Sequence, residues 1–143
     1  MHFSQVNFRA CGWKEEQEEL VHIFLSHTKR YTQDLNITTE FPEKYALEDI
    51  RLKKYVPDGY DQFGPHVDVV DKNTSTRFLV FFVYLDDNIS GGTHFDRINL
   101  TSPCKKGSML IFPPLWTHRH YAEKPIKEPK YILGSYLHYV GAL

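Results

Sequence analysis

Phe78-Leu79-Val80-Phe81-Phe82-Val83-Tyr84-Leu85 is the stretch that decides the fold. This continuous apolar run is rich in β-branched and aromatic residues, a composition typical of a strand buried on both faces. It is far shorter than the ~20 apolar residues of a membrane span. We therefore expect a central strand over residues 78–85, ended by the polar run Asp86-Asp87-Asn88.

Further strands are expected on both sides of this run. Residues 50–55 alternate apolar with polar side chains, and Pro57-Asp58-Gly59 marks a turn. Ser90-Gly91-Gly92 is another expected turn. Several short strands at near-regular spacing predict a sandwich or barrel of the jelly-roll kind. The other expected strands are residues 67–70, 93–98, 108–112, 117–121 and 131–139.

The N-terminal part of the chain has helical periodicity instead. Apolar residues recur at helical spacing over residues 13–35, and four glutamates lie in the first turns, where they favour the helix dipole. Residues 36–43 are expected to form a loop. We predict one mainly β (α+β) domain over residues 1–143, in which this helix packs on a β-barrel at about 45–140.

Composition narrows the classes of partner. The 143 residues carry 17 basic and 18 acidic side chains, a formal net charge of −1, which favours neither nucleic acid nor an anionic membrane as a partner. Cys11 and Cys104 form no C-x-x-C motif, so we expect two free thiols in a reducing cytosol, with a lone disulfide as the alternative. A cytoplasmic protein is expected, and the sequence does not define its oligomeric state.

His66 and Asp68 form the first part of a candidate metal site. They are two residues apart, so their side chains project from the same face of an extended segment. A second imidazole from a distant strand would complete a set of two nitrogens and one oxygen. That set leaves positions open on non-heme Fe(II) for a co-substrate and O2. A His-x-Asp pair by itself is a weak signal, and a surface hairpin is the alternative interpretation.

The second imidazole has two candidates, His118 and His120. Both point to one face if the segment is extended. We favour His120 because Lys130 follows it at a distance of ten residues, where its ammonium could hold the far carboxylate of an oxo-acid. The hydroxyl of Tyr84 could share that contact. Taken alone, Lys130 would more simply extend to solvent.

The order of these motifs resembles the Fe(II)- and 2-oxoglutarate-dependent dioxygenases, and most closely their prolyl 4-hydroxylase-like branch. The similarity runs from about Ile50 to Tyr139, some two-thirds of the chain. The matching stretches are KYVPDGYDQFGPHVD, which ends at Asp68, VYLDD at 83–87, GGTHF at 91–95, KKGSMLIFPP at 105–114 and HRHYAEKPIKEPKYI at 118–132.

The resemblance implies a double-stranded β-helix, a jelly roll with the metal inside its open end. His66, Asp68 and His120 would bind Fe(II). Lys130 and Tyr84 would hold the distal carboxylate of 2-oxoglutarate, and Tyr55 would line the same pocket. The implied reaction is hydroxylation of a substrate, coupled to decarboxylation of 2-oxoglutarate to succinate and CO2. O2 is the further co-substrate, and ascorbate is a candidate reductant.

The leading substrate is a prolyl residue in a peptide or protein. Residues 71–76 and 53–63 are plausible rims for an extended peptide, and Trp116 and Tyr121 could stack on a proline ring. Candidates for the dry wall of the cavity are Phe82, Phe95, Phe112 and Tyr136.

Two other classes compete with the oxygenase. One is a non-catalytic jelly-roll module that holds a structural zinc ion, but such sites usually close their shell with cysteines, and neither cysteine lies near the motif. The other is a cupin-like metal hydrolase or isomerase, which would bind metal without affinity for an oxo-acid.

Overall fold

The computed structural model describes residues 3–141. Over that range it contains one long helix, α1, ten strands and a short 3-10 helix, η1. The helices are α1 (Lys14–Asp34) and η1 (Trp116–His118). The strands are β1 (Ser4–Asn7), β2 (Tyr45–Leu47), β3 (Arg51–Tyr55), β4 (Phe63–His66), β5 (Arg77–Tyr84), β6 (Asn88–Phe95), β7 (Leu100–Cys104), β8 (Met109–Phe112), β9 (His120–Ala122) and β10 (Lys130–Tyr139).

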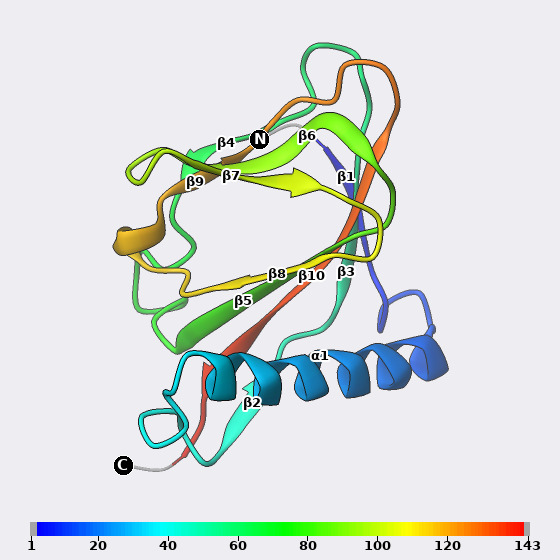
Figure 1. Cartoon of the computed structure of the whole chain (residues 1–143). Coiled ribbons are helices and arrows are strands. Elements are labelled where there is room, and N and C mark those ends of the chain that lie inside the picture. The colour runs from blue at the N-terminus through cyan, green and yellow to red at the C-terminus, as the bar shows by residue number, and fades with distance from the viewer. Residues whose placement is uncertain (1–2, 142–143) are drawn as a thin grey trace.

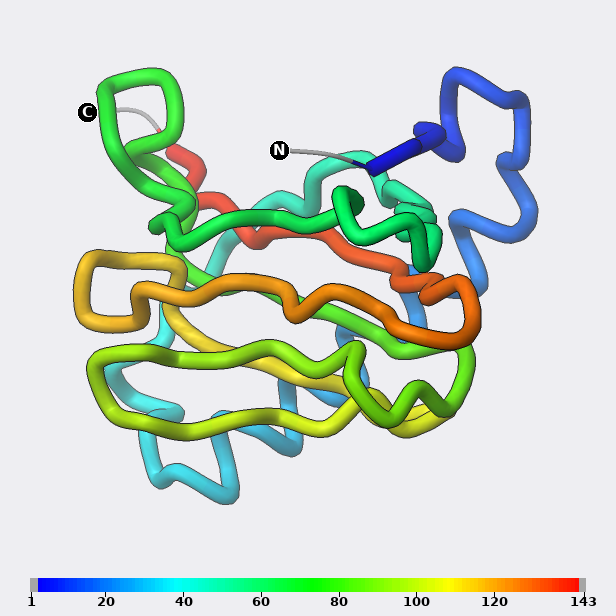
Figure 2. Tube along the Cα trace, turned by 90° about the horizontal axis from the view of Figure 1, so that it is seen from above, coloured from blue at the N-terminus to red at the C-terminus, as the bar shows by residue number. Residues whose placement is uncertain are grey.

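The strands form two antiparallel sheets that face each other. The larger sheet has the order β1-β3-β10-β5-β8, with β2 also paired to β10, and the smaller has the order β4-β9-β6-β7. Figure 1 shows α1 beneath the larger sheet and the smaller sheet on the other side of that sheet. In Figure 2, seen from above, the strands of the smaller sheet lie side by side toward the viewer. Strands β3 to β10 thus form the predicted jelly roll, and the predicted N-terminal helix packs on it.

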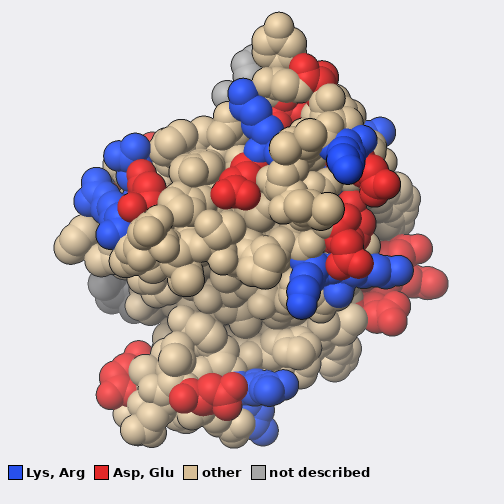
Figure 3. Space-filling view, turned by 45° about the horizontal axis from the view of Figure 1, so that its top comes forward, with Lys and Arg blue, Asp and Glu red and all other residues tan. Residues whose placement is uncertain are grey.

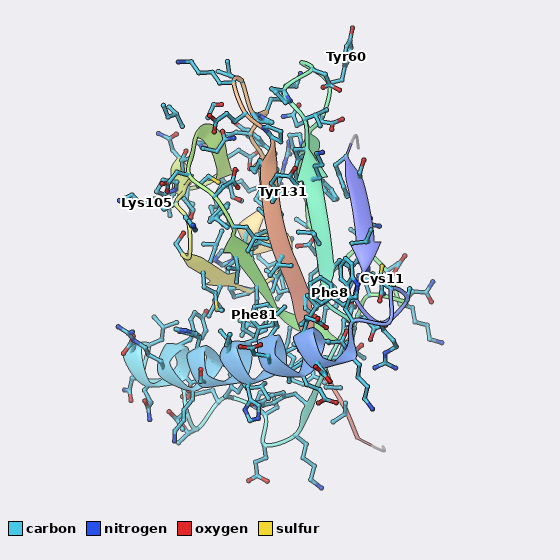
Figure 4. The ribbon with its side chains drawn as sticks, turned by 90° about the vertical axis from the view of Figure 1, so that its right-hand side faces the viewer. Phe8, Cys11, Tyr60, Phe81, Lys105 and Tyr131 are labelled. Carbon is cyan, nitrogen blue, oxygen red and sulfur yellow. The ribbon has the colours of Figure 1, made fainter. Side chains whose placement is uncertain are left out.

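Strand β5 is buried on both faces, as its sequence predicts. Val80 and Phe82 face the interior between the sheets, in one apolar cluster. Leu79 and Phe81 face the opposite way, toward the helix. The ring of Phe81 stacks on that of Phe24 in α1, with centroids 5.4 Å apart. Figure 4 shows Phe81 above the helix. The alternation with period two therefore places one central strand in two cores at once.

Helix α1 buries one narrow stripe, flanked by partly buried apolar residues, and exposes its opposite face. Its fully buried residues are Phe24, Thr28 and Thr32. The hydroxyl of Thr28 donates to the Phe24 carbonyl at 2.8 Å, so that its polar atom is satisfied within the helix. Over residues 3–141, no helix combines the length and apolar character needed to cross a membrane.

The strand predicted at residues 67–70 is wrong. The extended segment is β4, which ends at His66. Residues beyond it leave the sheet because the amide of Asp68 donates to the Pro114 carbonyl at 3.1 Å instead of to a neighbouring strand. Pro65 lies inside β4, which is tolerated because β4 is the edge strand of its sheet.

The turn predicted at residues 90–92 is also wrong, because both glycines lie inside β6. They serve close packing. A Cβ atom on Gly91 would lie 2.7 Å from the Lys130 side chain, and one on Gly92 would lie 2.6 Å from the Ser102 carbonyl oxygen. Strand β6 consequently begins earlier than predicted and ends at Phe95.

Other boundaries also differ from the sequence prediction. The strand expected at 117–121 divides into η1 and β9, where Arg119 separates the two. Strands β1, β2 and β7 were not predicted; β1 and β2 are short, and β7 contains Pro103 and is mostly exposed. Such edge segments have little of the apolar alternation on which strand prediction depends.

We expect Gly92→Ala to destabilise the protein by about 1–3 kcal/mol, because the new methyl group would displace the backbone of β7. Urea unfolding measures this difference. Gly64→Ala is the matched control, since nothing lies within 4 Å of a Cβ atom there. Equal stability of the two variants would contradict the close packing of β6 on β7.

Candidate metal centre

His66, Asp68 and His120 converge between the sheets. One nitrogen or oxygen from each lies within 4.8 Å of the others. Nε2 of His66 is 3.2 Å from one carboxylate oxygen of Asp68, and Nε2 of His120 is 3.6 Å from the other. The two histidines are directly opposite each other in the β4–β9 ladder. Asp68 and His120 are buried, with 8% and 1% exposure.

The hydrogen bonds of the two imidazoles fix their orientation. Nδ1 of His66 donates to the Gly64 carbonyl at 2.7 Å, and Nδ1 of His120 donates to the His118 carbonyl at 2.9 Å. A carbonyl oxygen only accepts, so Nδ1 carries the proton in each ring. In the neutral form of each ring the lone pair is then on Nε2, the nitrogen that faces Asp68. Carbonyl partners of this kind also orient metal-binding histidines.

Two polar atoms of this cluster have no hydrogen-bond partner among the described residues. Oδ2 of Asp68 and Nε2 of His120 are buried, and the described residues offer neither of them a hydrogen bond. Three lone pairs that face one another repel unless a proton or a metal ion lies between them. Two imidazoles and a carboxylate suit a first-row divalent metal with coordination positions left open, so the three side chains fit Fe(II).

The pKa shifts of Asp68 and His120 also favour binding of a divalent metal ion. Burial raises the pKa of Asp68, but His66, His120 and the Tyr136 hydroxyl outweigh it, and the pKa lies below its ordinary value. Burial lowers the pKa of His120, with Asp68 opposing the shift. A carboxylate and a neutral imidazole are the forms that bind metal ions.

Lys130 lies deep in the barrel, with 1% exposure. Its ammonium donates to the Glu123 carbonyl at 3.0 Å and lies 4.5 Å from the centroid of the Tyr55 ring. Within residues 3–141 no carboxylate forms an ion pair with it, and burial lowers its pKa to about 8. The Tyr84 hydroxyl, also buried, is 2.7 Å from the Thr93 hydroxyl. These groups could receive an anion.

A cavity of about 20 Å3 adjoins the three metal-site residues. Tyr55 lies on its wall, whereas Lys130 and Tyr84 are not among the residues that line it. The volume corresponds to about one water molecule, so a larger ligand requires these side chains to separate. Of the predicted wall residues, Phe82 and Tyr136 line this cavity; Phe95 and Phe112 pack against His120 instead.

The residues around His120 have different roles from those considered in the sequence. The ring of His118 bonds the Thr117 hydroxyl at 2.9 Å and is not part of the cluster, although its carbonyl orients His120. Tyr121 lies on the face of β9 opposite His120 and packs on His94. Trp116 is exposed. Tyr121 is therefore badly placed to meet a substrate in the cavity.

Sequence reasoning gave Lys53, Arg77 and Glu48 no individual role at the site, although Lys53 lies in the predicted rim at residues 53–63. Lys53 lies on the cavity wall. Arg77 donates to the Asp68 carbonyl at 3.2 Å and to Glu48 at 2.8 Å, and its guanidinium lies 4.0 Å above the Tyr136 ring. One signal was available: Lys53 and Tyr55 are two residues apart, and so share a face of β3.

Comparison with known proteins places the fold. No protein-family model matches the sequence, and no curated protein matches it. Among solved structures, a viral collagen prolyl hydroxylase from Paramecium Bursaria Chlorella virus-1, in its 2OG complex, is 21% identical over 97% of this chain and 80% of its own, with a TM-score of 0.74. A Pseudomonas putida prolyl-4-hydroxylase is 14% identical over 97% and 72%, with a TM-score of 0.61.

A third match is a prolyl hydroxylase from Trichoplax adhaerens in complex with a peptide fragment of hypoxia inducible factor. It is 14% identical over 65% of this chain and 44% of its own, with a TM-score of 0.56. The likeness is one of fold. This chain shares the jelly-roll fold of the prolyl hydroxylase structures.

We expect Mn(II) or Fe(II) to raise the unfolding temperature of the wild-type protein but not of His120→Ala. A metal ion at a hundred times its dissociation constant adds about 2.7 kcal/mol of stability. His118→Ala is the matched control, because its ring is not part of the cluster. Thermal unfolding under anaerobic conditions makes the comparison. A response lost in His118→Ala and kept in His120→Ala would assign the site to the other histidine.

We also expect the ligand-free protein to become more stable as pH rises from about 8 to about 9. The pKa of Lys53 and that of Lys130 are each lowered by burial to about 8, from an ordinary value of 10.5, so the unfolded chain binds more protons in this range. Above pH 9 the raised pKa of Cys104 opposes the trend.

Urea unfolding across this pH range measures the slope. Lys130→Met should flatten it, whereas Lys54→Met, an exposed change on the same chain, should leave it intact. An unchanged slope in Lys130→Met would show that its ammonium is solvated in the folded protein.

Proposed function

We propose that this protein is an Fe(II)- and 2-oxoglutarate-dependent oxygenase, and that it hydroxylates a prolyl residue in a peptide or protein. The observation that carries the proposal is the cluster of His66, Asp68 and His120, in which Oδ2 of Asp68 and Nε2 of His120 are buried and have no hydrogen-bond partner among the described residues. The fold shared with prolyl hydroxylases supports it.

The proposed metal ligands are these three side chains. The negative carboxylate of Asp68 and two neutral imidazoles would hold a divalent ion at net charge +1. Bound Fe(II) would supply the oxidation: 2-oxoglutarate and O2 are consumed, the substrate C–H becomes C–OH, and succinate and CO2 are released. The sheets would exclude water from the cavity, which apolar and aromatic side chains largely line.

Lys130 is proposed to bind the distal carboxylate of the oxo-acid. Its ammonium would exchange the Glu123 carbonyl for this carboxylate, a stronger partner for a buried cation. The Tyr84 hydroxyl would donate a second hydrogen bond. Surface charges give little guidance to a dianion, since both signs are interspersed on the face in Figure 3. Recognition would therefore depend on cations inside the barrel.

The prolyl assignment has separate support. The Trichoplax adhaerens structure that shares the fold contains a peptide fragment. In this chain Trp116 is 69% exposed and Tyr60 is 73% exposed, so that both rings are free to stack on an extended peptide. Trp116 opens η1, four residues before His120.

We expect the protein with Fe(II), ascorbate and 2-oxoglutarate to release succinate, and a proline-containing peptide to increase the rate. Succinate is measured across a peptide panel in which each member is matched by one with alanine in place of proline. His66→Ala and Lys130→Met should lose turnover at least about a hundredfold, since both act on the reacting complex. Lys54→Met should retain it.

The outcomes of this assay distinguish the prolyl assignment from the oxygenase assignment. Succinate release that is equal with proline and alanine peptides would overturn the prolyl assignment alone. Metal binding without any affinity for 2-oxoglutarate would overturn the oxygenase assignment and favour a cupin-like metal enzyme.

A further inference from the structure

Lys53 is a second amine at the cavity, half-buried on its wall, and the proposed function so far gives it no role. It lies in β3 and pairs with Ile132 of β10, which in turn pairs with Tyr84 of β5. These three residues thus form one row across the inner face of the larger sheet. Lys53 lines the same cavity as the candidate metal ligands.

The ammonium of Lys53 has no anionic partner. Its Nζ lies 5.2 Å from the centroid of the Phe3 ring and 5.3 Å from that of Phe63. Aromatic faces attract a cation but accept no proton from it as a carboxylate does. In the part of the chain that the structure describes, no hydrogen bond or ion pair reaches this nitrogen, and burial lowers its pKa to about 8.

Lys53 and Lys130 lie at different positions along the inner face of the larger sheet. Lys130 pairs with Tyr55, two residues along β3 from Lys53, a step of about 6.7 Å in a strand. The charge of Asp68 acts on Lys53, whereas Cys104, Glu123 and Asp86 act on Lys130. Lys53 lines the cavity together with the metal-site residues, whereas Lys130 is not among the residues that line it.

Two cations that start from neighbouring positions of one sheet suit a ligand with two anions. An extended five-carbon diacid carries one carboxylate at each end. We propose that Lys53 is a second carboxylate-binding residue, which contacts the oxo-acid carboxylate nearest to His66, Asp68 and His120. This inference rests on the proposed function, because it concerns the co-substrate of that site.

The test is equilibrium binding of 2-oxoglutarate to the Mn(II)-loaded protein, measured by titration calorimetry. Lys53→Met should weaken binding about tenfold, the factor that corresponds to ~1.4 kcal/mol. Lys54→Met is the matched control: it removes the same charge from the next residue, whose side chain lies on the opposite face over Tyr131. It should bind as the wild type does.

A shortened ligand assigns the end that Lys53 contacts. 2-Oxovalerate keeps the keto-acid group and lacks the distal carboxylate. The loss in Lys53→Met should persist with 2-oxovalerate, whereas the loss in Lys130→Met should disappear. If the Lys53→Met loss disappears instead, Lys53 contacts the distal carboxylate and the proposal is overturned.

Two further outcomes distinguish this inference from the function on which it rests. If the wild type binds 2-oxoglutarate and Lys53→Met binds it equally well, the inference fails and the oxygenase proposal stands. If the wild type does not bind it, the proposed function itself fails.

Stability separates ligand binding from a structural role. Lys53→Met removes an ammonium without an anionic partner, so its urea midpoint should equal or exceed that of the wild type. Lys53→Arg, which keeps the charge, should recover part of the affinity. A reduced affinity together with a lower urea midpoint would assign Lys53 a structural role and overturn the proposal.

Discussion

The pairing of β4 with β9 is the constraint on which the site depends. It sets His66 directly opposite His120 although the two histidines are distant in sequence, and their ring centroids are 4.4 Å apart. Opposite residues of an antiparallel pair point to the same face, so the two imidazoles must meet once this register forms. Each ring then donates from Nδ1 to the carbonyl two residues before it, and the same local geometry is used twice. Shifting the register by one residue would turn one imidazole to the outer surface.

Asp68 completes the cluster by other means. It lies beyond the end of β4, and its backbone is held at both polar atoms: its amide donates to Pro114, and its carbonyl accepts from Arg77. Arg77 is itself bound to Glu48, whose pKa is lowered although burial raises it, because hydrogen bonds and positive charge from Arg77 and His138 outweigh burial. Two candidate ligands thus come from a rigid ladder and the third from a loop that a charged network fixes in place.

The sequence predicts the parts of this structure that follow from local periodicity. The helix at 13–35 and the doubly buried strand at 78–85 are confirmed within a residue or two, because their apolar patterns are long and regular. The glycines at 91 and 92 misled the prediction, since glycine marks a turn and a close backbone approach alike, and only tertiary contacts decide between them. The clustering of His66, Asp68 and His120 likewise depends on a pairing between distant strands, which periodicity does not encode. The buried network of Arg77 and Glu48 leaves no signal in a single sequence for the same reason.

Two ammonium groups inside an aromatic barrel are a local conflict, and conflicts of this kind in a folded protein tend to mark functional positions. Neither Lys53 nor Lys130 forms an ion pair within residues 3–141, and burial lowers the pKa of each. The barrel accommodates them with weaker partners: two aromatic rings for Lys53, and a carbonyl with the Tyr55 ring for Lys130. An entering dianion would replace these partners with two carboxylates, so that the free energy of ligand binding would include relief of the unpaired charge. A selective site for a small diacid can thus exist in a protein whose formal net charge is −1.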